Sequence, residues 1–119
     1  MILEINDQEY SFKFGIRFLR EMDKKYTIQQ NGIPFGASMQ MIAAKLLTGD
    51  ITALMQVLTV ASETEKPKVK ESELECYIEE LDDIEKFLDD VMEELKNSNA
   101  TKLGFTQAVE EIQGNMKKK

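Results

Sequence analysis

The stretch ITALMQVLTVAS, residues 51–62, has a pattern typical of a helix that is apolar on almost every side. Such a helix is either the central element of a core or is covered by a partner. Asp50 directly precedes it and can cap its first turn, and Gly49 suits the position just past the end of another helix, residues 37–48. The sequence therefore predicts two consecutive helices at the centre of the fold.

The N-terminal residues predict a β-hairpin. Two short runs of β-favouring residues, 1–5 and 8–12, flank Asn6-Asp7, and both turn residues tolerate left-handed backbone. A two-residue turn here sets Leu3 opposite Tyr10. The face that the rest of the domain must cover then holds four residues: Leu3, Ile5, Tyr10 and Phe12.

Residues 13–26 follow with the spacing of an amphipathic helix. Its predicted apolar stripe is Ile16, Leu19, Met22 and Tyr26, with Phe18 one turn before Met22. Residues 27–36 interrupt this helix, since Asn31-Gly32 is a strong turn pair. Two very short strands can flank that turn. The basic residues of the helix form either a solvated face or a surface that meets the acidic half of this chain or of a neighbour: Arg17, Arg20, Lys24 and Lys25.

The second half of the chain carries the whole excess of negative charge. The net charge is −7, whereas residues 1–60 hold six acidic and six basic residues. Polar residues 63–71 predict a connector. Residues 72–97 predict two acidic helices, with Ser72 as the cap of the first. The second contains DDIEKFLDDVMEELK, residues 82–96, in which most carboxylates come in pairs.

The paired carboxylates allow four interpretations. A calcium loop needs alternating oxygen ligands and a glycine at its sharp turn, and this stretch has neither. A catalytic dyad needs two carboxylates with shifted pKa values in one cleft. DNA mimicry needs a long negative surface that nothing else in the sequence indicates. A solvated helix face is the interpretation that the spacing favours, because the pairs fall between the apolar positions.

The apolar positions of that helix form an unbroken stripe about 17 Å long at 1.5 Å per residue. The stripe either packs on residues 37–62 or is exposed for a partner. Methionine is flexible and frequent at surfaces that accept varied partners, so two methionines outside the stripe join the candidates. The candidate partner-binding surface is Ile84, Phe87, Leu88, Val91, Met92, Leu95, Met39 and Met55.

Missing residue types argue against several functions. The chain has no histidine and a single cysteine, Cys76, so the commonest general base and the usual zinc cage are unavailable. We predict no catalytic residues, no metal site and no cofactor. We expect Cys76 to be a small core or boundary residue. The negative charge disfavours nucleic acid, no apolar run is long enough for a membrane span, and the first residues lack the features of a signal peptide.

Four segments, in this order, carry a family resemblance: the hairpin leading into FKFGIRFLREMDKKY (12–26), NGIPFG (31–36), TEKPKVKESELECYIEE (64–80) and DIEKFLDDVMEELKNSNATK (83–102). Together they resemble the tail assembly chaperones of long-tailed phages and prophages of Gram-positive bacteria. The likeness covers about residues 1–102. It transfers no residue-level motif, and Cys76 stands where a polar residue is expected.

The resemblance implies a protein without enzymatic activity. Such chaperones bind the helical tape-measure protein, keep it soluble and help to recruit tail-tube subunits in the host bacterial cytoplasm. They are absent from the mature virion. Many also exist as a longer frameshifted form, and we hypothesise that the codons of Lys117–Lys119 are the slippage site. Partners implied in this way are the tape-measure protein, the tail-tube protein, the frameshifted form and further copies of the chain.

The expected fold is mainly α, an N-terminal β-hairpin followed by a bundle of about five helices. One globular domain spans residues 1–99, with the hairpin at 1–12, a helical core at 14–62, the connector at 63–71 and the acidic helices at 72–97. Residues 100–119 are expected to be a flexible tail. Its core should include Phe14, Leu19, Ile42, Leu46, Leu54, Leu58, Phe87 and Val91. The alternative functions are a small tail or head–tail connector protein retained in the virion and an acidic inhibitor of a nucleic-acid site.

Overall fold

The computed structural model describes residues 1–117 and shows a mainly α fold with an N-terminal hairpin, as expected. Residues 1–117 form six helices and two antiparallel hairpins. In chain order these are β1 (Ile2–Ile5), β2 (Gln8–Ser11), α1 (Ile16–Lys25), β3 (Thr27–Gln30), β4 (Ile33–Gly36), α2 (Ser38–Leu47), α3 (Ile51–Ser62), α4 (Glu71–Glu79), α5 (Ile84–Asn97) and α6 (Lys102–Lys117).

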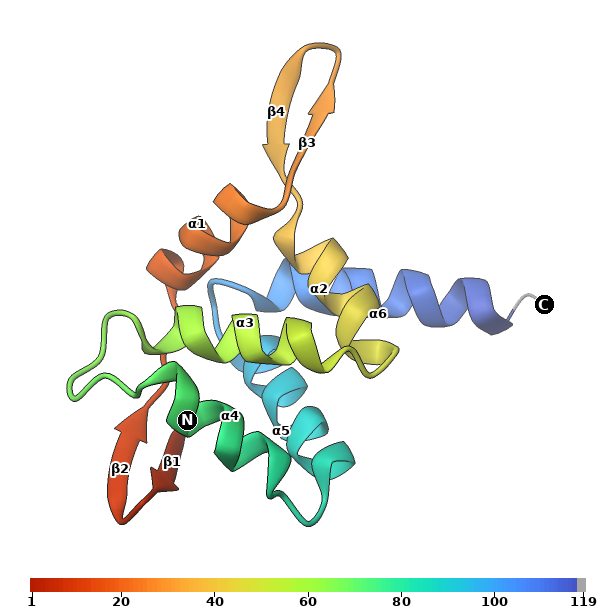
Figure 1. Ribbon diagram of the computed structural model, residues 1–119. Coiled ribbons are helices and arrows are strands. Elements are labelled where there is room, and N and C mark those ends of the chain that lie inside the picture. The colour runs from red at the N-terminus through yellow and green to blue at the C-terminus, as the bar shows by residue number, and fades with distance from the viewer. Residues whose placement is uncertain (118–119) are drawn as a thin grey trace.

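Helix α3 is the centre of the molecule, with other helices around it (Figure 1). It packs on α1, α2 and α4. The side chain of Asp50 accepts a hydrogen bond from the Ala53 N–H at 3.0 Å, which is the predicted N-terminal cap. Gly49 has a φ of +78° and ends α2, as its position predicts. The apolar segment 51–62 is therefore a core element, and its own chain provides most of its cover.

The first hairpin has the predicted register. Leu3 lies opposite Tyr10, and the Phe12 N–H donates to the Met1 carbonyl at 2.8 Å. Asn6 and Asp7 have φ values of 53° and 64°, the left-handed pair that a tight hairpin turn requires. Leu3, Ile5 and Phe12 are buried, so this face is covered by the rest of the fold.

Helix α4 begins two residues earlier than its predicted cap implies. Glu71 is already helical and Lys70 occupies the cap position without a side-chain cap, so Ser72 lies inside the first turn. Glu71 and Glu73 in that turn interact favourably with the positive end of the helix dipole. The predicted connector is not wholly solvated either, because Val69 is buried in the core.

Helix α6 occupies residues 102–117, within the segment 100–119 for which the sequence predicted a flexible tail. This helix packs along α2 and α5. Its inward residues follow the i, i+3, i+4, i+7 spacing and are buried or half-buried: Phe105, Ala108, Val109 and Ile112. As a sequence signal this stripe is weak, because the segment contains Gly104 and Gly114 and few large apolar residues.

The link between α5 and α6 is held by two hydroxyl groups. The Thr101 hydroxyl donates to the Leu95 carbonyl at 2.7 Å and is completely buried, and the Ser98 hydroxyl donates to the Phe14 carbonyl. Gly104 lets α6 approach α2 closely, since a Cβ atom there would lie 3.3 Å from the Cβ of Met39. The C-terminal helix is thus an integral part of the packing.

Candidate functional site

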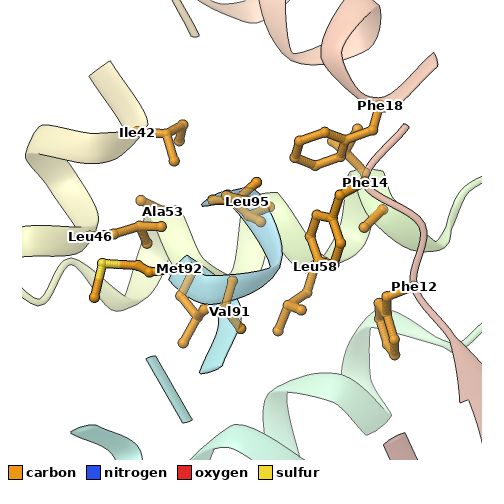
Figure 2. Close-up of a cluster of buried hydrophobic side chains, with 14 of the residues drawn as sticks. Phe12, Phe14, Phe18, Ile42, Leu46, Ala53, Leu58, Val91, Met92 and Leu95 are labelled. Atoms are coloured by element: carbon orange, nitrogen blue, oxygen red, sulfur yellow. The ribbon is translucent and has the colours of Figure 1, made fainter. Parts of the chain in front are cut away.

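The stripe of α5 packs on the core of its own chain. Val91 and Leu95 have no exposed surface, and Phe87 and Met92 are also buried. Figure 2 shows Val91, Met92 and Leu95 within one cluster of side chains that also holds Leu46, Ala53 and Leu58. Only Ile84 and Leu88 at the edge of the stripe are half-buried. Of the six stripe residues, these two offer a partner the most side-chain surface.

The two methionines of the predicted surface lie elsewhere. Met39 is buried between α2 and α6, beside Gly104. Met55 is half-buried on α3 and packs against the edge of the core. The structure therefore does not bring the eight predicted residues together into one exposed patch.

The acid pairs of α5 face solvent or serve local contacts. Asp83 caps the helix by accepting from the Lys86 N–H at 3.0 Å, and Asp90 forms an ion pair with the Lys86 ammonium at 3.1 Å. Glu94 lies 3.7 Å from the amino group of Met1. Within residues 1–117, no three His, Cys, Asp or Glu residues are grouped in a way that could hold a metal ion.

Cys76 is exposed on α4, contrary to the prediction of a core or boundary position. The stripe of α4 that faces the core is made by Leu74 and Ile78, which are both buried. Cys76 lies two residues from each, and a helix turns by about 200° over two residues. Its position on the solvated side follows from that angle.

Helix α1 buries only part of its predicted apolar stripe. Phe18 and Met22 point into the core, where Phe14 packs edge-on against Phe18 with ring centroids 5.2 Å apart. Leu19 is only half-buried, and Ile16 is 68% exposed. The predicted stripe was Ile16, Leu19, Met22 and Tyr26, and of these Met22 is buried and Tyr26 is half-buried. The aromatic pair decides the rotation of the helix, so part of the apolar surface of α1 is left outside.

The second hairpin, β3–β4, projects away from the helices (Figure 1). All eight of its strand residues are exposed. Asn31 and Gly32 form its turn with φ values of 52° and 78°. One face carries three large apolar side chains, with exposed fractions from 36% to 56%: Ile28, Ile33 and Phe35. A two-stranded hairpin in water is marginally stable on its own, so this arm gains from being covered.

The base of the arm is fixed to α1 and α2. The Asp23 carboxylate accepts hydrogen bonds from both the N–H and the hydroxyl of Ser38, and the Ala37 N–H donates to the Tyr26 carbonyl at 2.7 Å. Gly36 passes so close to Asp23 that a Cβ atom would lie 2.4 Å from its Cγ. The arm is therefore anchored at one end and free along its length.

An open groove runs between α1 and this arm. We call it the α1–β4 groove, and its lining residues are Ile16, Leu19, Arg20, Asp23, Lys24, Thr27, Pro34, Phe35 and Gly36. Apolar atoms form most of its surface and two cations stand on its rim. It combines exposed apolar side chains of α1 and of the arm.

The cations on and near the rim differ in whether they are already paired with a carboxylate. Lys24 pairs with Glu21 at 3.0 Å, and this hydrogen bond, together with the lysine charge, lowers the pKa of Glu21. Within residues 1–117, Arg17 and Arg20 form no ion pair. Residues 26–44, which include the arm, carry no charged side chain at all. The groove is thus a neutral to basic region of an acidic protein.

A second groove lies between β1 and α5 and has the opposite character. Its lining combines the apolar or aromatic residues Ile2, Tyr77 and Phe87 with acidic residues that include Asp90 and Glu93. Phe87 is the one predicted site residue that lines either groove. Sequence spacing could have found this position but not the α1–β4 groove, which depends on the rotation of α1.

Comparison with known proteins gives one match. A family model described as phage tail assembly chaperone protein, TAC, matches residues 2–110. No curated protein and no solved structure matches the chain. Within the described residues, no helix combines the length and hydrophobicity that crossing a membrane requires.

Proposed function

Because the chain belongs to the phage tail assembly chaperone family, we propose that it binds the tape-measure protein during tail assembly and keeps it soluble. In this proposal it also helps to recruit tail-tube subunits. The role is binding rather than catalysis, and it is carried out in the host bacterial cytoplasm before the tube closes. The partners are the tape-measure protein, the tail-tube protein and a longer frameshifted form of the chain.

The observation that carries the proposal at the level of mechanism is the exposed apolar surface around α1 and β3–β4. Ile16, Ile33 and Phe35 are each about half exposed or more. A long helical partner with unshielded apolar residues aggregates unless those residues are covered. Contact with such a surface would shield them, and the many carboxylates of α4 and α5 would keep the complex dispersed.

The domain organisation that accompanies this proposal differs from the expected one. We propose that residues 1–117 act as a single unit, because buried residues from Leu3 to Val109 belong to one core cluster. Of the suggested slippage codons, those of Lys118 and Lys119 specify residues outside the described part of the chain. A frameshift at this site stays a prediction that the coding DNA tests.

Co-expression tests the proposed function. With this chain present, we expect the tape-measure protein of the same phage or prophage to accumulate in the soluble fraction, and without it in the pellet. The measurement is the soluble share of the tape-measure protein after centrifugation. Equal solubility in both cultures would contradict the chaperone role.

Mass spectrometry of purified particles separates the proposal from its main alternative. A chaperone is absent from finished virions, whereas a small tail or head–tail connector protein is present in them at a fixed copy number. Detection of this chain at such a stoichiometry would favour the structural alternative.

A further inference from the structure

We infer that the α1–β4 groove binds a helical segment whose apolar stripe is flanked by carboxylates. This inference rests on the proposed function and adds the surface used and the charge of the partner. The α5 stripe, which the sequence suggested for this role, is mostly buried in the core. The groove, by contrast, is open and has a ready apolar lining.

Charge complementarity identifies the partner. The chain as a whole has a net charge of −7 and would repel an acidic helix. Arg17, Arg20 and Lys24 are exposed on the side of the molecule where the neighbouring arm has no charge. Arg20 stands on the groove rim without an ion pair in residues 1–117. An acid-flanked helix therefore finds attraction at this groove and repulsion at α4 and α5.

One carboxylate, Asp23, also lines the groove and keeps its negative charge, so that Arg20, Lys24 and Asp23 together give the lining a net charge of +1. Asp23 accepts from the Ser38 N–H at 3.2 Å and from the Ser38 hydroxyl, and it sits under Gly36 at the base of the arm. Glu21 is paired with Lys24. The cation left without a partner is Arg20, so we expect it to be the main polar contact of the bound helix.

The strand that borders the groove favours a helix over an added β-strand. Hydrogen-bonded and non-hydrogen-bonded pairs alternate along an antiparallel hairpin. Starting from the hydrogen-bonded Tyr26–Ala37 pair, the alternation makes Gln29–Pro34 a non-hydrogen-bonded pair. The nitrogen of Pro34 therefore points to the free edge of β4, where it has no hydrogen to donate. Side-chain contacts with a helix need no such donor.

Two designed peptides of about 18 residues test this inference. Both carry leucine at i, i+3, i+4 and i+7, and the positions flanking the stripe are glutamate in one peptide and lysine in the other. At low salt we expect the glutamate peptide to shift the amide resonances of Ile16, Arg20 and Phe35 in NMR spectra. The lysine peptide should instead shift resonances of α4 and α5. We expect at least about fivefold tighter binding of the glutamate peptide at the groove, weakened by added salt.

Charge reversal at the rim gives the matched controls. Arg20→Glu and Lys24→Glu should each weaken binding of the glutamate peptide about fivefold or more. Lys68→Glu has the same charge change at an exposed residue that does not line the groove, and should change binding less than about twofold. Circular dichroism confirms that all three variants are folded.

Several results would overturn the inference. These are equal binding of both peptides at the groove, equal effects of Arg20→Glu and Lys68→Glu, or no shift of the groove resonances. If one of these results is found while the chain still solubilises the tape-measure protein, the α1–β4 groove is not the binding surface and the proposed function stands. If the groove binds the glutamate peptide selectively but the chain does not solubilise the tape-measure protein, the groove inference stands and the proposed chaperone function is contradicted.

Discussion

At the scale of single residues, two neighbours on α6 show how burial separates structural from dispensable side chains. Phe105 has no exposed surface, whereas Leu103, two positions earlier, is 79% exposed. Both are large and apolar, so residue type alone does not distinguish them. Only Phe105 lies on the stripe that meets α2 and α5.

We predict that Phe105→Ala lowers the free energy of unfolding by about 3–5 kcal/mol, because it removes a buried ring and leaves a cavity. Leu103→Ala is the matched control on the same helix, and it should change stability by no more than about 0.5 kcal/mol. Urea denaturation followed by circular dichroism measures both. Similar stability of the two variants would mean that α6 does not pack as described.

At the scale of elements, α5 has an acidic face and an apolar face, and the two have different roles. Its carboxylates cap the helix, pair with Lys86 and face water, while its stripe closes the core. For α1 the prediction was correct only in part, because Met22 is buried whereas Ile16 is exposed. Phe18 and Met22 are the stripe that became buried.

We predict that Met92→Asp unfolds or strongly destabilises the protein. The carboxylate would replace a thioether that is 9% exposed, and an uncompensated charge in such a site costs about 3–5 kcal/mol. Asp89→Asn, on the exposed side of the same helix, should change stability by no more than about 0.5 kcal/mol. Thermal unfolding of both variants is the measurement. A folded Met92→Asp protein with near-normal stability would show that this end of the stripe is open to a partner.

At the scale of the whole molecule, the core is continuous from the first hairpin to the last helix. A domain that ended at residue 99 would lack the side chains that α6 places against α2. Burial of one large side chain contributes roughly 1.5–3 kcal/mol, and small domains have only about 5–15 kcal/mol of stability in total. Loss of α6 would therefore remove a large fraction of that stability.

We predict that a chain truncated after Thr101 loses cooperative unfolding and exposes apolar surface. Leu103→Ala in the full chain, at an exposed position of the same helix, is the control and should leave the unfolding transition unchanged. Thermal melts and binding of a dye that reports exposed apolar surface measure the difference. A cooperative transition in the truncated chain would restore the view of a dispensable tail.

The sequence alone determined the features that local chemistry dictates. The Asn6-Asp7 turn, the Asp50 cap, the glycine end of α2 and the stripe of α5 each depend on residues within one or two turns of one another. Family membership also followed from the order and spacing of such local patterns. All of these patterns depend on residues close together in the sequence, so they can be recognised without knowledge of the tertiary contacts.

Only the tertiary structure decided which apolar surfaces are buried. The spacing of α1 allowed Ile16 or Phe18 to face inward, and packing of Phe14 against Phe18 selected one rotation and left Ile16 at a groove. The weak stripe of α6 became structural because Gly104 and Thr101 bring it against α2 and α5. Burial requires two complementary surfaces in contact. The sequence of one element does not reveal the shape of the surface that packs against it.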